Sequence, residues 1–96
     1  MLLDNRATLI ENMTDNLPTL RKKLKLTQEG LAKIIGSSRH SVMQIEAKKR
    51  KMTWNTFLSL VFLFDKNKET AGMLKNLGIY TDDLERIIIQ RYDAEI

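Results

Sequence analysis

The apolar residues of this chain recur every three or four positions almost from end to end, which is the period of an α-helix buried on one side. One proline and four glycines leave little room for long loops. The pattern therefore predicts an all-α protein. We expect helices over residues 4–13, 18–24, 28–35, 39–47, 54–64 and 69–77, and a last helix that starts at Thr81.

Residues that favour helix ends divide these segments. Side chains able to cap a helix N-terminus stand at Asp4, Thr27, Ser37 or Ser38, Thr53 and Thr81. Pro18 follows Asp15 and Asn16 and is typical of a first helical turn, so a break is expected between the first two helices. Gly36 and Gly78 are expected to end helices, because glycine takes the left-handed conformation at little cost.

The helix faces that collect apolar side chains predict the core. Its expected members are Ala7, Leu9, Ile10, Met13, Leu17, Leu20, Leu24, Leu31, Ala32, Ile34, Ile35, Val42, Ile45, Trp54, Phe57, Leu58, Val61, Phe62, Phe64, Leu84, Ile87 and Ile88. Arg91 shares the face of the last three. Ninety-six residues suffice for one such core, so a single domain over 1–96 is expected.

The composition argues against several classes of protein. The chain has no cysteine, which excludes disulfides and thiolate metal sites, and its single histidine, His40, lacks metal-binding partners. The N-terminal sequence does not read as a signal peptide, and the apolar run 57–64 is too short to span a bilayer. We expect a soluble, cytoplasmic protein without cofactor or metal. No phosphate loop, acid–base pair or nucleophile motif suggests an enzyme.

Positive charge is concentrated in one third of the chain. Residues 21–51 contain ten Lys or Arg and two acids, whereas the remainder contains six basic and ten acidic residues. The net charge is +8 in the first part and −4 in the second. Such asymmetry favours a polyanionic partner, although an ordinary solvated lysine-rich face would look the same.

The segment 39–47 carries unusual chemistry on one helical face. At 100° per residue, Val42 and Ile45 point to one side, and His40, Met43 and Gln44 point to the other. Arg39 lies at the edge of this second face, in the first turn, where a cation opposes the helix dipole. The arrangement indicates a role outside the helix. Ala32 and Gly36 allow close approach and a tight turn before this segment, which is helix-turn-helix spacing.

Residues 17–64 combine several motifs at fixed spacing. They are Leu26-Thr27-Gln28, Leu31-Ala32, Gly36-Ser37-Ser38, Ser41-Val42, Ile45-Glu46 and Lys49-Arg50-Lys51, followed by the apolar positions of the next helix. This half of the chain resembles the Cro/lambda-repressor-like (Xre-type) helix-turn-helix family. The resemblance implies a lambda-repressor-like bundle with a DNA-binding unit over 14–64, here with an extra N-terminal helix and a C-terminal extension, 65–96, of two helices.

The resemblance also implies which residues meet DNA. The base-contacting positions would be Arg39, His40, Met43 and Gln44. The phosphate-contacting positions would be Thr27, Gln28, Ser38, Ser41, Lys48, Lys49, Arg50, Lys51 and Thr53. Arginine can form two hydrogen bonds with guanine, glutamine can form two with adenine, and methionine can contact the methyl group of thymine. Arg39 and His40 could instead contact phosphates.

Two local features complete the expectation. Glu46 is expected to serve structure through an ion pair with a nearby cation. Glu46-Ala47-Lys48 stands where the family often has a glycine turn, so the backbone there could turn at once or continue as helix for one more turn.

The expected function is that of a sequence-specific DNA-binding transcriptional regulator, with a repressor favoured over an activator. It would act as a homodimer on a pseudo-palindromic operator. The alternative is an antitoxin of a toxin–antitoxin pair, which would bind a toxin protein as well as its own operator. The segments that could cover a toxin are the N-terminal helix and residues 66–96.

Overall fold

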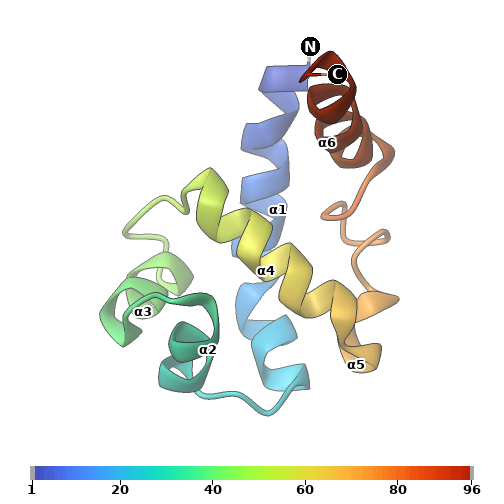
Figure 1. Cartoon of the computed structure of the whole chain (residues 1–96). Helices are drawn as coiled ribbons and strands as arrows, with labels where there is room; N and C mark the ends of the chain where they lie inside the picture. The colour runs from blue at the N-terminus through green and yellow to red at the C-terminus, as the bar shows by residue number, and fades with distance from the viewer. Residues whose placement is uncertain (1, 96) are drawn as a thin grey trace.

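The structure is a computed structural model that describes the backbone of residues 2–95 and the side chains of residues 5–89. This part of the chain is all-helical and contains no strand, as the sequence pattern predicts (Figure 1). The helices are α1 (Leu2–Lys23), α2 (Gln28–Ile35), α3 (Arg39–Glu46), α4 (Trp54–Lys66), α5 (Lys68–Ala71) and α6 (Asp82–Glu95).

Helix α1 is continuous, and the predicted break before Pro18 is wrong. The separate N-terminal helix expected over 4–13 is therefore the first half of one long helix. Its buried stripe is Leu9, Met13, Leu17 and Leu20. A proline inside a helix costs roughly 3 kcal/mol, whereas each buried side chain of this size contributes about 1.5–3 kcal/mol. Burial of the continuous stripe outweighs the local signal of Pro18.

The polar residues near the predicted break bind within the helix or across to another element. The Thr14 hydroxyl donates a hydrogen bond to the Ile10 carbonyl at 2.8 Å, and the Asn16 amide donates one to the Asn12 carbonyl at 2.8 Å. Asp15 pairs with Lys48, which follows α3. None of these side chains caps a new helix, so the α1 backbone continues through them.

Of the other predicted helix ends, the N-terminal caps at Thr27, Ser38, Thr53 and Thr81 and the C-terminal end at Gly36 are confirmed. Asp4 lies inside α1 instead of capping it, and Gly78 follows turns and not a helix. The hydroxyl oxygens of Thr27, Ser38, Thr53 and Thr81 accept hydrogen bonds from backbone N–H groups three residues later. Gly36 and Gly78 both take the left-handed conformation, with φ of 72°. These ends depend on atoms within a few residues, which is why the sequence pattern locates them.

One hydrophobic core runs from Leu9 on α1 to Leu84 on α6. Helix α1 is its centre, because α3, α4, α5 and α6 all pack against it. Figure 1 shows α4 crossing α1, with α6 beside the N-terminal half of α1 and the α2–α3 pair near its other end. The segment after residue 65 thus packs back onto the same core as the rest of the chain.

Four predicted core residues lie at the surface: Ala7, Ile34, Phe62 and Ile88. Phe62 is 68% exposed because α4 is apolar on more than one face, and Phe57, Leu60, Val61 and Phe64 occupy the inward side. Ile34 is 54% exposed because α2 turns Leu31 and Ala32 inward instead. The side chain of Arg91 lies outside the described part.

The helix expected over 69–77 is only partly formed. Helix α5 stops at Ala71, and the chain continues through turns to Gly78. Thr70 is fully buried, and its hydroxyl donates a hydrogen bond of 2.6 Å to the Phe64 carbonyl. The turns bring both Leu74 and Ile79 into the core.

Candidate nucleic-acid interface

Helices α2 and α3 form a closely packed pair joined by Gly36, Ser37 and Ser38. Leu31 and Ala32 of α2 and Val42 and Ile45 of α3 are buried. A side chain at Gly36 would meet nothing within 4 Å, so glycine is needed there for its backbone conformation and not for space. The buried contacts fix the orientation of α3.

The outer face of α3 is presented to solvent. Arg39, His40 and Met43 are exposed, and Gln44 is half-buried. The four predicted base-contacting residues therefore lie together on one side of an eight-residue helix. The first turn contains no acidic residue. The face offers a cation, an imidazole, an amide and a thioether to a partner.

Serine and arginine side chains meet at the start of α3. The Ser38 hydroxyl accepts a hydrogen bond from the Ser41 backbone N–H at 3.0 Å and donates one to the Ser41 hydroxyl at 3.0 Å. The Arg50 guanidinium also donates to the Ser41 hydroxyl. Three of the predicted phosphate-contacting residues are thus adjacent, with Arg50 held beside the positive end of α3.

The backbone after α3 turns at once, without glycine. Helix α3 ends at Glu46, and Lys48 takes the left-handed conformation with φ of 61°. The N–H of Lys49 donates to the Gln44 carbonyl at 2.9 Å and that of Lys48 to the Ile45 carbonyl at 3.0 Å, the two bonds of a Schellman motif. The helix does not run one turn longer.

The turn leads into an exposed basic segment, Lys48–Lys51. The Lys48 ammonium lies 2.8 Å from an Asp15 carboxylate oxygen of α1, and this hydrogen bond raises the pKa of Lys48. Met52 is buried and anchors the end of the segment. Lys48 therefore has a partner within the protein, whereas the sequence predicted it only as a phosphate contact.

The two threonines of the predicted phosphate set are both exposed helix caps. Thr27 caps α2 through the Gly30 N–H at 2.9 Å, and Thr53 caps α4 through the Thr56 N–H at 3.2 Å. Each therefore marks a helix N-terminus that faces solvent, where backbone N–H groups favour an anion.

A polar network that the sequence did not locate joins α3 to α1. Glu46 accepts hydrogen bonds from the Arg21 guanidinium at 2.7 Å and 3.0 Å and from the Gln28 amide at 3.0 Å. Arg21 also donates to the Leu26 carbonyl at 2.9 Å. The expected ion pair of Glu46 is confirmed, and Gln28, predicted to meet a phosphate, directs its amide nitrogen into this network.

The network also sets the protonation of its members. Burial alone would raise the pKa of the Glu46 carboxyl, but the hydrogen bonds from Arg21 and Gln28 and the charge of Arg21 outweigh it, so this pKa lies below its ordinary value of 4.5. The hydrogen bond to Glu46 raises the pKa of Arg21. Both groups are charged at neutral pH, and together they hold the end of α3.

Comparison with protein families, with curated proteins and with solved structures gives no match for this chain. Within the described residues, no helix is both long and apolar enough to cross a membrane. The same residues include no group of three or more His, Asp or Glu side chains placed to hold a metal ion. The basic surface around α3 is the candidate functional site.

Proposed function

We propose that this protein is a sequence-specific DNA-binding transcriptional regulator, and that α2 and α3 form a helix-turn-helix unit of the Cro/lambda-repressor-like type. One observation carries the proposal: α3 exposes Arg39, His40 and Met43 on one side while Val42 and Ile45 lock its other side into the core. Stability alone does not call for a cation in the first turn of a helix.

The dimensions and chemistry of α3 suit the major groove. An α-helix with its side chains is about 10–12 Å across, and the major groove of B-DNA is about 12 Å wide. Arg39, in the first turn, would read guanine, and Gln44, which lies one turn after His40, would read adenine. His40 and Met43 lie between them on the same face.

The surroundings of α3 supply phosphate contacts. Lys49, Arg50 and Lys51 are exposed directly after it, and the α2 N-terminus at Thr27 offers backbone N–H groups. A homodimer would place two α3 helices about one DNA turn apart on a pseudo-palindromic operator. Occupying such a site would block transcription, so we propose a repressor.

Selection of bound sites from random double-stranded DNA tests the proposal. The wild-type protein should enrich one motif whose two halves lie about 10 base pairs apart. The Arg39→Ala variant should lose or relax one position of that motif, whereas Lys75→Ala, which removes an exposed cation far from α3 in the chain, should enrich the wild-type motif. Failure of the wild-type protein to enrich any motif would refute sequence-specific binding.

A further inference from the structure

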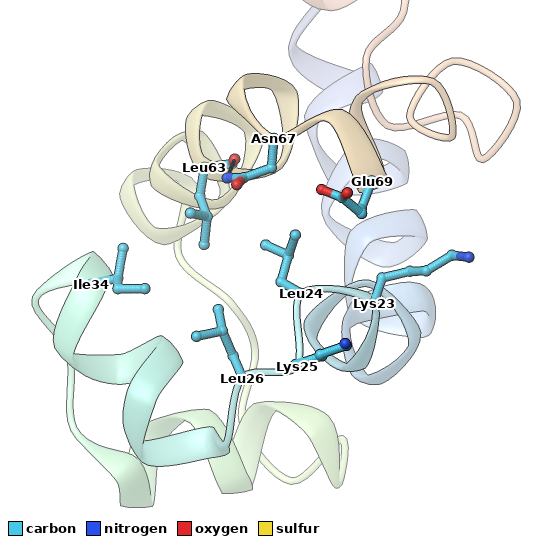
Figure 2. A pocket seen from close by; sticks show the side chains of 8 residues that line it. All are labelled: Lys23, Leu24, Lys25, Leu26, Ile34, Leu63, Asn67 and Glu69. Carbon is cyan, nitrogen blue, oxygen red and sulfur yellow. Dashed lines mark hydrogen bonds between the residues drawn. The ribbon is translucent and has the colours of Figure 1, made fainter.

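An apolar groove lies between α2 and the C-terminal half of α4. It consists of two adjoining hollows that share Ile34, Leu63 and Asn67. Figure 2 shows Leu24, Leu26, Ile34 and Leu63 around one of the hollows. Phe62 lines the other. The groove contains no residue of the outer face of α3, so a partner bound there would leave that face accessible.

Within residues 5–89, the two most exposed large apolar side chains belong to this groove. Phe62 and Ile34 have 68% and 54% of their surface exposed, although both stand in well-formed helices. Neither fills a gap in the core. Exposed apolar side chains that adjoin one another are a feature of association sites.

The rim of the groove is basic. Lys23 and Lys25 border one hollow and Lys66 the other, against one acid, Glu69. The Lys66 ammonium lies 5.7 Å from the centre of the Phe62 ring. A fitting partner would present apolar side chains next to carboxylates.

Helix α6 carries such a surface. Leu84 and Ile87 are buried, while Ile88 and Ile89 are 48% and 49% exposed. The first turn of the same helix contains Asp82, Asp83 and Glu85. Asp83 pairs with Arg86 of the next turn, which leaves the exposed carboxylates of Asp82 and Glu85 for a basic rim. An amphipathic helix that lays its apolar side into a hydrophobic groove is a recurring mode of recognition.

We propose that α6 of a second copy of this chain docks into the Ile34–Phe62 groove. Two-fold symmetry makes the contact reciprocal, so each subunit gives one groove and one α6. Each of the two contacts would need to bury about 400 Å² per subunit to reach the roughly 800 Å² typical of a stable interface. Direct pairing of α6 with α6 would leave Ile34 and Phe62 exposed. The groove is therefore the better docking site for α6. This inference rests on the dimeric part of the proposed function and not on DNA binding.

Two single variants and their mixture test this arrangement. Phe62→Glu puts a carboxylate in the groove, and Ile89→Lys puts a cation on α6; both positions are exposed, so folding should be retained. Each homodimer then has both contacts damaged. We expect the dimerisation affinity of each variant alone to be about 30-fold or more below that of the wild type. Sedimentation equilibrium without DNA gives the affinities, circular dichroism checks folding, and Lys75→Glu is the matched control.

The mixture separates docking of α6 from other modes of self-association. One contact is intact when the two variants pair, because the α6 of the Phe62→Glu chain meets the groove of the Ile89→Lys chain. The mixture should therefore form heterodimers more tightly than either variant forms homodimers.

Four outcomes would overturn the proposal. A wild-type protein that is monomeric at hundreds of micromolar has no such interface. Retained dimers of Phe62→Glu alone would indicate α6–α6 pairing, and retained dimers of Ile89→Lys alone would indicate a groove that binds something else. A mixture that stays monomeric would also refute it. Binding of each variant to random-sequence DNA, measured separately, reports on the basic surface around α3, so the failure of this interface and the failure of the DNA-binding proposal give different results.

Discussion

Arg21 on α1 and Glu46 at the end of α3 form a two-point ion pair, with Nε 2.7 Å from Oε2 and a terminal nitrogen 3.0 Å from Oε1. The two side chains are only 11% and 8% exposed. Charge-assisted, two-point contacts are among the stronger polar interactions in proteins. The pair therefore sets the position of the last turn of α3 relative to α1, in addition to the buried contacts of Val42 and Ile45.

The Glu46 carboxylate should make stability depend on pH. Its folded pKa is lowered, so its contribution is present above the unfolded value near 4.5 and is lost as the pH falls through the folded pKa. Replacement by glutamine should lower the free energy of unfolding by about 2–3 kcal/mol at neutral pH, with a smaller difference in acid. Urea unfolding at several pH values measures this, and Glu29→Gln, at an exposed site, is the control. A difference that persists unchanged to about pH 3 would contradict the ion-pair account.

Substitutions on the two sides of α3 should have different effects. Arg39→Ala or Gln44→Ala should weaken binding to the best DNA site by about 1–3 kcal/mol and relax preference at one base pair, with folding intact. Val42→Ala should instead lower stability by about 1–3 kcal/mol through lost burial and a cavity. A binding panel of single-base operator variants, with melting curves, separates the two classes. Equal losses on specific and random DNA would mean that Arg39 and Gln44 contact phosphates and not bases.

Binding to DNA should weaken steeply with salt. The slope of the logarithm of the association constant against the logarithm of salt concentration should become shallower by about 0.9 for each phosphate contact removed. We expect this for Lys49→Ala and Lys51→Ala, which remove exposed cations. Lys48→Ala should change the slope less, since Lys48 pairs with Asp15. An unchanged slope in all three variants, as expected for the control Lys75→Ala, would exclude the segment after α3 from the phosphate contacts.

Two glycines at the α5–α6 connection should respond oppositely to alanine. Gly78 has φ of 72°, and a Cβ there would lie 2.7 Å from the Asn12 amide nitrogen of α1. Gly78→Ala should therefore lower the free energy of unfolding by about 1–3 kcal/mol. Gly72 is right-handed helical, with nothing within 4 Å of its added Cβ, and Gly72→Ala should be neutral or stabilising by about 0.4–1 kcal/mol. Denaturant unfolding measures both, and equal effects would contradict the argument.

The turn after α3 illustrates a feature that sequence reasoning left open. Ala47 and Lys48 stand where a glycine would mark a turn, so the sequence left open whether the helix ends here or continues for one more turn. The Lys48 backbone takes the left-handed conformation within the Schellman motif, and its ammonium lies beside Asp15 of α1. A left-handed residue other than glycine costs about 1–2 kcal/mol, and no residue type in this segment signals that the chain adopts it.

The sequence by itself determined the all-helical class, the caps at Thr27, Thr53 and Thr81, and the exposed face of α3, and it left the cap of α3 open between Ser37 and Ser38. Each of these depends on periodicity or on atoms a few residues apart. Only the tertiary structure decided that α1 runs through Pro18, that Arg21 is the partner of Glu46, and that Phe62 and Ile34 stay outside. Local preferences are worth about 1–3 kcal/mol each, and the burial of a whole helix face exceeds them. Which apolar face is buried depends on how the helices pack, and no single segment determines that packing.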